Sequence, residues 1–229
     1  MMPSHPPQRR AVQLAAGLGM SLGMSLGLGL IPGLAIGPAR AEPAPDTTVV
    51  WHCYRNAAAT VLATEKTESV GSRYLLRKTT ADLKADCAVE QRPTDRVLGE
   101  DDPTNAKGWS AYNTIGLVQG LLILDEGTSP DRSLVIVEVP AGRKILDVGY
   151  SVQEGCSPSS GCQSEEFRFD DKELTFWRQL KEKPTPKNCQ GYAGFMKTTG
   201  SAALEERSVF TFATRKVAGS GTKRCTVRQ

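Results

Sequence analysis

The sequence predicts a mainly β protein, an antiparallel β-sandwich or barrel-like domain with a central meander, little helix and disulfide staples. Apolar and polar residues alternate with a period of two through most of residues 42–229, as half-buried strands require. Clusters of Gly, Pro, Asp and Ser separate these runs at the spacing of turns. The chain also carries six cysteines, an even number that is typical of a disulfide framework.

Residues 1–41 have the organisation of an export signal. Arg9 and Arg10 precede a stretch rich in Leu, Gly, Ala and Met over residues 11–37, and Ala39-Arg40-Ala41 has the small-x-small form that signal peptidase accepts. We predict a signal peptide cleaved after Ala41 and a single β-rich domain over residues 42–229. The alternative is a membrane anchor, since the stretch could cross a hydrocarbon core of about 30 Å. Seven glycines and a proline weaken that alternative.

The export route stays open between two mechanisms. The Arg9-Arg10 pair, the Gly-rich core and Arg40 resemble a twin-arginine signal. The segment after the pair, residues 11–14, matches the usual continuation of that signal only loosely, so the general secretory route is equally favoured. Both routes predict a periplasmic or secreted protein.

The charge of the mature chain is balanced. The whole chain has 28 basic and 25 acidic side chains, but three arginines lie in the predicted signal, which leaves 25 of each sign. A neutral chain has no general electrostatic attraction for polyanions. We therefore expect no nucleic-acid partner, no stable membrane anchor after processing, and as partner a protein or an envelope polymer.

The cysteines are expected to form three disulfides. Six cysteines allow 15 pairings, and proximity in the sequence favours Cys53–Cys87, Cys156–Cys162 and Cys189–Cys225. A metal site is not expected, because the chain has no C-x-x-C pair and the predicted mature part has a single histidine, His52. The missing C-x-x-C also disfavours a disulfide-exchange enzyme. No cofactor is expected.

In the first half of the mature chain, strands are predicted over residues 47–54 and 72–78 from their β-branched and aromatic content. Residues 56–69 suit a helix or a strand, and residues 83–91 suit a strand or a short helix. Residues 91–108 are dominated by turn formers and predict a long exposed loop.

The clearest part is a meander with strands over residues 116–124, 133–139 and 144–152. Short turns at 125–132 and 140–142 impose antiparallel neighbours. The apolar run Leu121–Leu124 predicts a central strand that is buried on both faces. The meander resembles one blade of a β-propeller, but the sequence shows no second copy, so a sandwich or barrel is favoured.

The C-terminal part predicts two hairpins. The first covers residues 165–176 and turns at Asp170-Asp171. Residues 181–188 are broken by prolines and are expected to be extended, and residues 202–207 suit one or two helical turns. The second hairpin pairs residues 207–217 with 223–228 around the glycines at 219–221. The total is about nine strands.

Four aromatic residues are the best candidates for a binding surface: Trp109, Tyr112, Phe176 and Trp177. Trp109 and Tyr112 follow the acidic loop, and alternation turns one ring of the Phe176-Trp177 pair outward unless both faces are covered. Core packing is the competing role for these rings.

Catalytic candidates are weaker. His52 is expected to point outward, away from Trp51 and Cys53, and to be a surface histidine rather than a general base. Acidic clusters at residues 100–102, 125–131, 165–166 and 170–171 could supply a carboxylate pair, although they fall where turns are expected. No residue is assigned a catalytic role.

These observations predict an exported, non-catalytic binding or inhibitor-type protein of unknown ligand. The alternative is a carboxylate-dependent hydrolase that acts on an envelope polymer. Two carboxylates facing each other across a cleft would favour the hydrolase.

Overall fold

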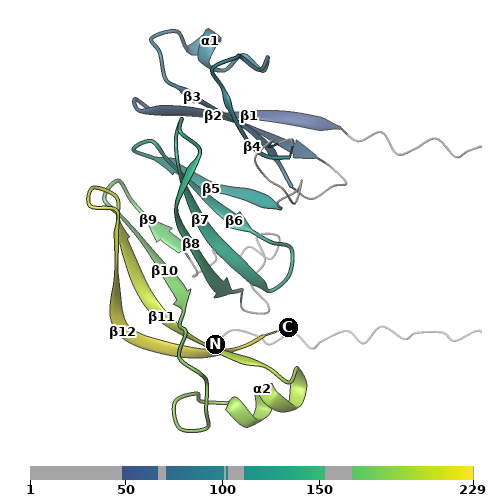
Figure 1. Cartoon of the computed structure of the whole chain (residues 1–229), viewed down its shortest axis with the longest axis vertical. Coiled ribbons are helices and arrows are strands. Elements are labelled where there is room, and N and C mark those ends of the chain that lie inside the picture. The colour runs from purple at the N-terminus through teal and green to yellow at the C-terminus, as the bar shows by residue number, and fades with distance from the viewer. Residues whose placement is uncertain (1–47, 67–70, 101, 103–110, 153–166, 229) are drawn as a thin grey trace, which may run out of the picture. The chain divides into compact units, whose positions relative to one another are not determined.

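The structure is a computed structural model, and it describes residues 48–66, 71–100, 102, 111–152 and 167–228. These residues form twelve strands and two short helices, and the strands lie in three antiparallel sheets of four (Figure 1). The predicted mainly β, antiparallel architecture is confirmed. The predicted signal and the Cys156–Cys162 pair lie outside the described residues.

The first sheet has the order β1-β2-β3-β4. Its strands are β1 (Val49–Arg55), β2 (Ala59–Lys66), β3 (Arg73–Lys78) and β4 (Arg96–Gly99), and helix α1 (Leu83–Asp86) lies between β3 and β4. The ambiguous segment 56–69 therefore contains a strand, and the segment 83–91 contains a short helix. The loop predicted over residues 91–108 was wrong in part, because it includes the edge strand β4.

The second sheet has the order β5-β6-β7-β8. Its strands are β5 (Tyr112–Val118), β6 (Leu121–Glu126), β7 (Asp131–Glu138) and β8 (Arg143–Ser151). The single strand predicted over residues 116–124 is two strands joined by a two-residue turn at Gln119 and Gly120. Both turn residues have positive φ, 48° and 77°, which is the backbone that lets a two-residue turn match the twist of a hairpin.

The third sheet has the order β12-β11-β10-β9. Its strands are β9 (Phe167–Phe169), β10 (Glu173–Gln179), β11 (Ala202–Thr211) and β12 (Lys216–Val227), with helix α2 (Tyr192–Thr198) between β10 and β11. The hairpin at Asp170-Asp171 is confirmed. The helical turn predicted at 202–207 was wrong, because these residues begin β11. The closing hairpin turns at residues 212–215 rather than at the glycines.

Helices are a minor part of the described chain. Among the described residues, no helix is long and apolar enough to cross a membrane.

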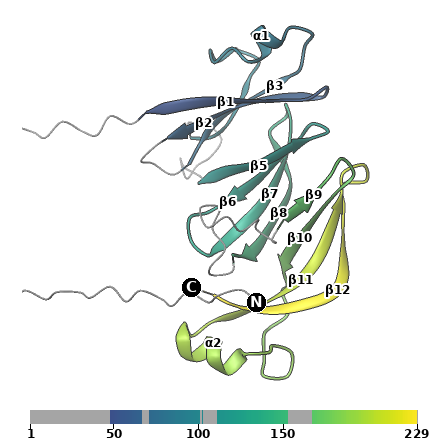
Figure 2. The ribbon, with the colours of Figure 1, turned by 180° about the vertical axis from the view of Figure 1, so that it is seen from behind.

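All three sheets share one connectivity. In each of them, four strands that follow one another in the chain are also neighbours in the sheet (Figure 2). The blade-like meander that the sequence shows once is therefore present three times. The copies were not visible in the sequence because a meander needs only alternating strands and turns, which different residues supply equally well.

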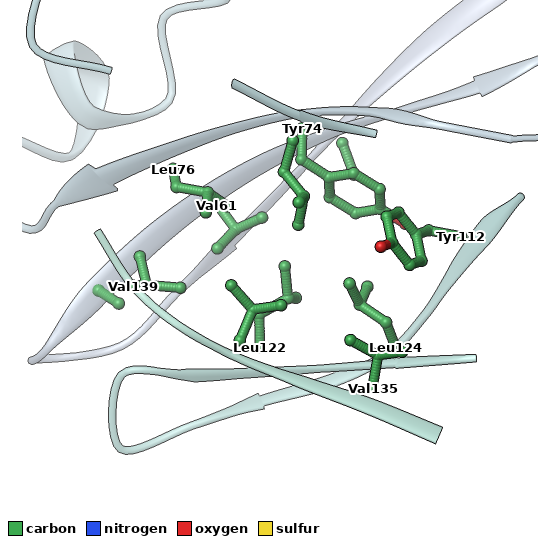
Figure 3. Packing of buried hydrophobic residues seen from close by; sticks show 12 residues of the cluster. Val61, Tyr74, Leu76, Tyr112, Leu122, Leu124, Val135 and Val139 are labelled. Carbon is green, nitrogen blue, oxygen red and sulfur yellow. The ribbon is translucent and has the colours of Figure 1, made fainter. Parts of the chain in front are cut away.

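Two apolar clusters join the three sheets. The first, between the first and second sheets, includes Tyr74 and Leu76 from β3 and Leu122 and Leu124 from β6 (Figure 3). The second joins the other face of β6, through Leu121 and Ile123, to phenylalanines of the third sheet. Residues 121–124 are each at most 2% exposed, so the prediction of a strand buried on both faces is confirmed.

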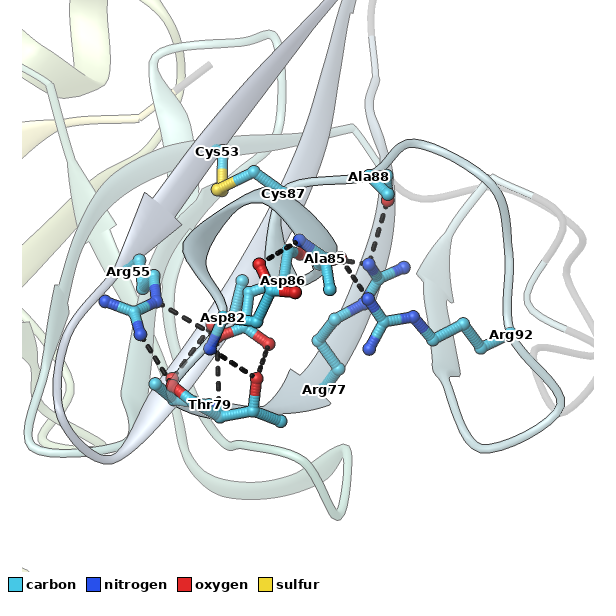
Figure 4. The surroundings of a disulfide bond; sticks show 12 residues. Cys53, Arg55, Arg77, Thr79, Asp82, Ala85, Asp86, Cys87, Ala88 and Arg92 are labelled. Atoms are coloured by element: carbon cyan, nitrogen blue, oxygen red, sulfur yellow. Dashed lines mark hydrogen bonds and ion pairs between the residues drawn. A yellow bond between two sulfur atoms is a disulfide. The ribbon is translucent and has the colours of Figure 1, made fainter.

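A third, smaller cluster covers the opposite face of the first sheet. It contains Leu62, Leu75 and Val97, with Trp51 and Cys87 packed against it. Cys87 is bonded to Cys53, so the disulfide attaches the loop that carries α1 to this face (Figure 4). The second disulfide joins Cys189 to Cys225 of β12. Two of the three predicted pairings are confirmed, and the third stays a prediction.

The loop after β3 is also held by a buried ion pair. Arg77 and Asp95 have side chains that are 3% and 0% exposed, and the Arg77 Nε donates to Asp95 Oδ1 at 3.0 Å. The Arg77 guanidinium further donates to three carbonyl oxygens of the loop, those of Asp86, Ala88 and Glu90. Buried charge is tolerated where it is paired and hydrogen-bonded in this way.

Candidate binding site

The first hairpin turns of the three sheets lie close together. These turns are Asn56–Ala58 between β1 and β2, Gln119-Gly120 between β5 and β6, and Asp170–Lys172 between β9 and β10. Residues from all three line one cavity of about 560 Å³, which we call the turn pocket. Because the sheets share one connectivity and pack face to face, equivalent turns are brought together by the fold itself.

Hydrogen bonds between the turns fix their relative positions. Asn56 Nδ2 donates to the carbonyl oxygen of Leu117 at 3.4 Å, which joins the first sheet to the second. Gln119 Nε2 donates to the carbonyl oxygen of Asp171, which joins the second sheet to the third. Asn56 Oδ1 also accepts from the backbone N–H groups of Ala58 and Ala59, as asparagine commonly does in turns.

The turn pocket has an apolar part and a polar part. The apolar part is formed by Ala57, Ala58, Leu117 and Val118, and the polar part by Asn56, Gln119, Asp170 and Asp171. Ligand pockets are commonly 300–1,000 Å³ in volume and mostly apolar with a few polar groups, so the turn pocket fits this class.

The side chain of Asp170 is held by backbone N–H groups that follow it in the chain. Its Oδ1 accepts from the N–H groups of Lys172 and Glu173, at 2.7 and 2.9 Å. These backbone hydrogen bonds lower the pKa of the Asp170 carboxyl below its usual value, and the bond from the Glu173 N–H has the largest effect. Asp170 is therefore ionised at neutral pH, and the pocket has a negatively charged side.

Two of the predicted binding aromatics are core residues. Tyr112 is 2% exposed and packs edge-on against Tyr74, with ring centroids 6.3 Å apart. Phe176 is 0% exposed in the cluster between the second and third sheets. The expectation that these rings form an exposed contact is therefore corrected: large apolar rings are buried because their transfer from water contributes strongly to folding. Trp109 lies outside the described residues.

Trp177, on β10, is half-buried and faces charged neighbours. Two guanidinium groups lie over its ring, that of Arg207 at 5.4 Å and that of Arg224 at 4.4 Å from the centroid. Arg224 is itself fixed by Glu205, at 2.7 Å, and by the carbonyl oxygen of Ser151. The Trp177 ring is thus engaged in cation–π contacts within the fold. None of Tyr112, Phe176 and Trp177 lines the turn pocket.

His52 lies beside a second, smaller cavity. Its Nε2 is 2.7 Å from Glu65 Oε2, and its side chain is 42% exposed, which agrees with the predicted surface position. His52 lines a cavity of about 220 Å³ with Asn113 and Thr114 of the second sheet, on the face of its own sheet that points away from Trp51, as predicted. Trp51 instead belongs to the small cluster on the opposite face of the first sheet.

Thr114, which lines this cavity, is hydrogen-bonded to the buried Tyr74. Tyr74 OH accepts a hydrogen bond from Thr114 Oγ1 at 3.3 Å, and burial raises the pKa of Tyr74 to about 12. A phenol with so high a pKa is a poor proton donor at neutral pH, so Tyr74 is not suited to act as an acid beside this cavity.

The described acidic clusters are largely engaged in ion pairs. The pairs are Lys66–Glu100, Arg96–Asp102, Arg132–Asp125 and Arg228–Asp131. Asp125 additionally accepts a hydrogen bond from Tyr150 OH at 2.6 Å. Within the described residues, no group of three or more His, Cys, Asp or Glu side chains is placed to hold a metal ion. The Glu165-Glu166 cluster lies outside the described residues.

The sequence indicated only part of the turn pocket. The Asp170-Asp171 turn was predicted from its composition, whereas Asn56 and Gln119 carried no signal of a shared site. No protein-family model, curated protein or solved structure matches the chain. The class is therefore defined by the fold: an all-β, disulfide-bonded protein of three stacked four-stranded meanders. The two disulfides among the described residues indicate an oxidising environment, extracellular or periplasmic.

Proposed function

We propose that this chain is an exported, non-catalytic binding protein and that the turn pocket is its ligand site. The observation that carries the proposal is that three turns from three different sheets, linked by side-chain hydrogen bonds, line one mostly apolar cavity of about 560 Å³. A pocket built on rigid, cross-linked sheets loses little conformational entropy when a ligand binds, which favours affinity.

The geometry supports a binder better than a hydrolase. Asp170 and Asp171 both line the turn pocket, but they are adjacent on one turn, whereas Asn56, Ala57 and Ala58 supply another part of the wall. Carboxylate-dependent hydrolysis needs two groups that flank the scissile bond, about 5–9.5 Å apart. A general acid also needs a raised pKa, and the pKa of Asp170 is lowered.

We further propose that the chain is exported through cleavage of residues 1–41. N-terminal sequencing of the exported protein is expected to begin at Glu42, because Ala39-Arg40-Ala41 completes a signal of basic start and apolar core. Replacing Arg9 and Arg10 by lysines is expected to block export only if the route is twin-arginine. Recovery of Met1 in a membrane fraction would contradict cleavage.

Filling the turn pocket is expected to abolish ligand binding. We would screen residues 42–229 against a library of apolar amines, carboxylates and neutral sugars by ligand-observed NMR, then repeat the screen with Ala58→Trp. Ala58 is an exposed pocket residue, so an indole at this position fills space without replacing core atoms. The hits of the wild-type protein should be lost in the variant.

The matched control is Ala141→Trp, an exposed alanine in the turn between β7 and β8. This variant should keep every hit, and thermal unfolding should show that all variants are folded. Ala57→Trp, in the same turn as Ala58, serves as a second pocket variant. Hits that survive both pocket substitutions would refute the site. Cleavage of peptidoglycan by the wild type but not by an Asp170→Asn/Asp171→Asn variant would show that the protein is a hydrolase.

A further inference from the structure

The geometry points to a small organic cation, an apolar body with one ammonium or guanidinium end, as the ligand that the turn pocket selects. This inference rests on the proposed binding function and adds the chemistry of the ligand. It comes from comparing what the apolar and the polar parts of the pocket can still offer once the protein's own hydrogen bonds are formed.

The apolar part requires an apolar body. Ala57 and Ala58 come from the first sheet, and Leu117 and Val118 come from the end of β5 in the second. A group of the size of a phenyl ring or a short alkyl chain would cover this surface and remove it from water.

Each side-chain amide of the polar part already uses one of its two N–H donors. Asn56 Nδ2 donates to the Leu117 carbonyl, and Gln119 Nε2 donates to the Asp171 carbonyl. The amide oxygen of Asn56 is also in use, since it accepts from two backbone N–H groups of its own turn. A ligand carboxylate or phosphate that accepts from the second N–H of either amide would lie in the same pocket as the carboxylates of Asp170 and Asp171, which repel an anion.

The carboxylates remain as the groups that a ligand can reach. The side chain of Asp171 takes part in no hydrogen bond or ion pair among the described residues, and Asp170 uses only Oδ1, for two backbone N–H groups. The basic residues nearest in sequence, Arg168 and Lys172, do not line the turn pocket, although the charge of Lys172 helps to lower the pKa of Asp170. A cation with hydrogen-bond donors complements such a site, and an anion does not.

Three probes of similar shape and different charge test the inference: 2-phenylethylamine, 2-phenylethanol and 3-phenylpropionate. Their affinities for residues 42–229 would be measured by NMR titration at pH 7 and low salt. The amine is expected to bind about fivefold more tightly than the alcohol, because it can form one partly exposed ion pair. The carboxylate is expected to bind more weakly than either. Asp171→Asn should reduce the preference for the amine, and Asp170→Asn/Asp171→Asn should remove it, while the affinity for the alcohol stays unchanged.

The control is Asp147→Asn, which removes an exposed carboxylate of β8 that does not line the pocket. It should leave all three affinities unchanged. Equal affinities of the three probes, or tighter binding of 3-phenylpropionate, would overturn the inference while the binding function stands, provided that Ala58→Trp still abolishes binding. If no probe responds to Ala58→Trp, the proposed site itself has failed, and the inference with it.

Discussion

Replacing Arg77 by alanine is expected to lower the free energy of unfolding by about 3–5 kcal/mol, the cost typical of breaking a buried ion pair. The variant would leave the Asp95 carboxylate, which is 0% exposed, without its guanidinium partner. It would also remove the donors to three loop carbonyl oxygens. Urea unfolding of residues 42–229 followed by tryptophan fluorescence measures the difference.

An exposed arginine provides the comparison. Arg143 pairs with Glu138 at 2.7 Å, but its side chain is 65% exposed, and Glu138 also pairs with Arg215. Arg143→Ala should therefore cost less than about 1 kcal/mol. Arg77→Lys keeps the charge but cannot reproduce the planar fork of donors, so an intermediate loss is expected. Equal losses for Arg77→Ala and Arg143→Ala would show that the buried network does not stabilise the loop.

The strands of the core were predictable because a strand with one buried face alternates apolar and polar residues, and a strand with two buried faces is apolar throughout. Leu121–Leu124 could be placed on a central strand because an unbroken apolar run is stable only where both faces of a strand are covered. The turn within the strand predicted over residues 116–124 was missed, because Gln-Gly is a less common pair for two positive φ values than Asn-Gly or Asp-Gly. One missed turn changed a three-stranded meander into a four-stranded one.

Short edge strands and polar networks were less visible. β4 has four residues and follows a segment rich in turn formers, so its pairing with β3 is decided by tertiary packing rather than by local preference. Likewise, Arg77 lies between Leu76 and Lys78 near the end of β3, and this pattern gives no sign that its side chain is buried. The partners that make its burial tolerable, such as Asp95 and the carbonyl oxygen of Glu90, are 13 to 18 residues away in the chain.

The candidate site could not be predicted from the sequence because it forms only when the three sheets pack against one another. Asn56, Gln119 and Asp170 are each ordinary turn residues, and they meet only because three meanders of the same connectivity pack in series. The sequence-based search favoured aromatic residues instead. Tyr112 and Phe176 were needed in the core, and Trp177 was covered by arginines.

Removing the two described disulfides one at a time is expected to give unequal losses of stability, although they close loops of nearly the same length. The sequence separations are 34 and 36 residues, for which the chain-entropy relation gives about 4 kcal/mol in each case. That relation assumes that the native state is unchanged by the loss of the bond. The two loops differ in how well they satisfy this assumption.

The loop closed by Cys53–Cys87 has other anchors. Arg55 pairs with the fully buried Asp86 at 3.0 Å (Figure 4). Asp86 also accepts from the N–H and the hydroxyl group of Thr80. With the Arg77 network, these contacts keep the loop ordered without the disulfide. The Cys53→Ala/Cys87→Ala variant should therefore show nearly the full loss of about 4 kcal/mol, since only its unfolded state gains freedom.

The segment closed by Cys189–Cys225 has weaker support. Helix α2 has no buried residue, and the Lys223–Glu182 pair joins side chains that are 47% and 44% exposed. Without the disulfide this segment can loosen in the native state as well, so the Cys189→Ala/Cys225→Ala variant should lose only about 2 kcal/mol. Amide hydrogen exchange is expected to accelerate over residues 190–200 in this variant, and to remain slow over residues 83–95 in the first. Equal losses, with no local acceleration of exchange, would show that both loops are held equally well by their other contacts.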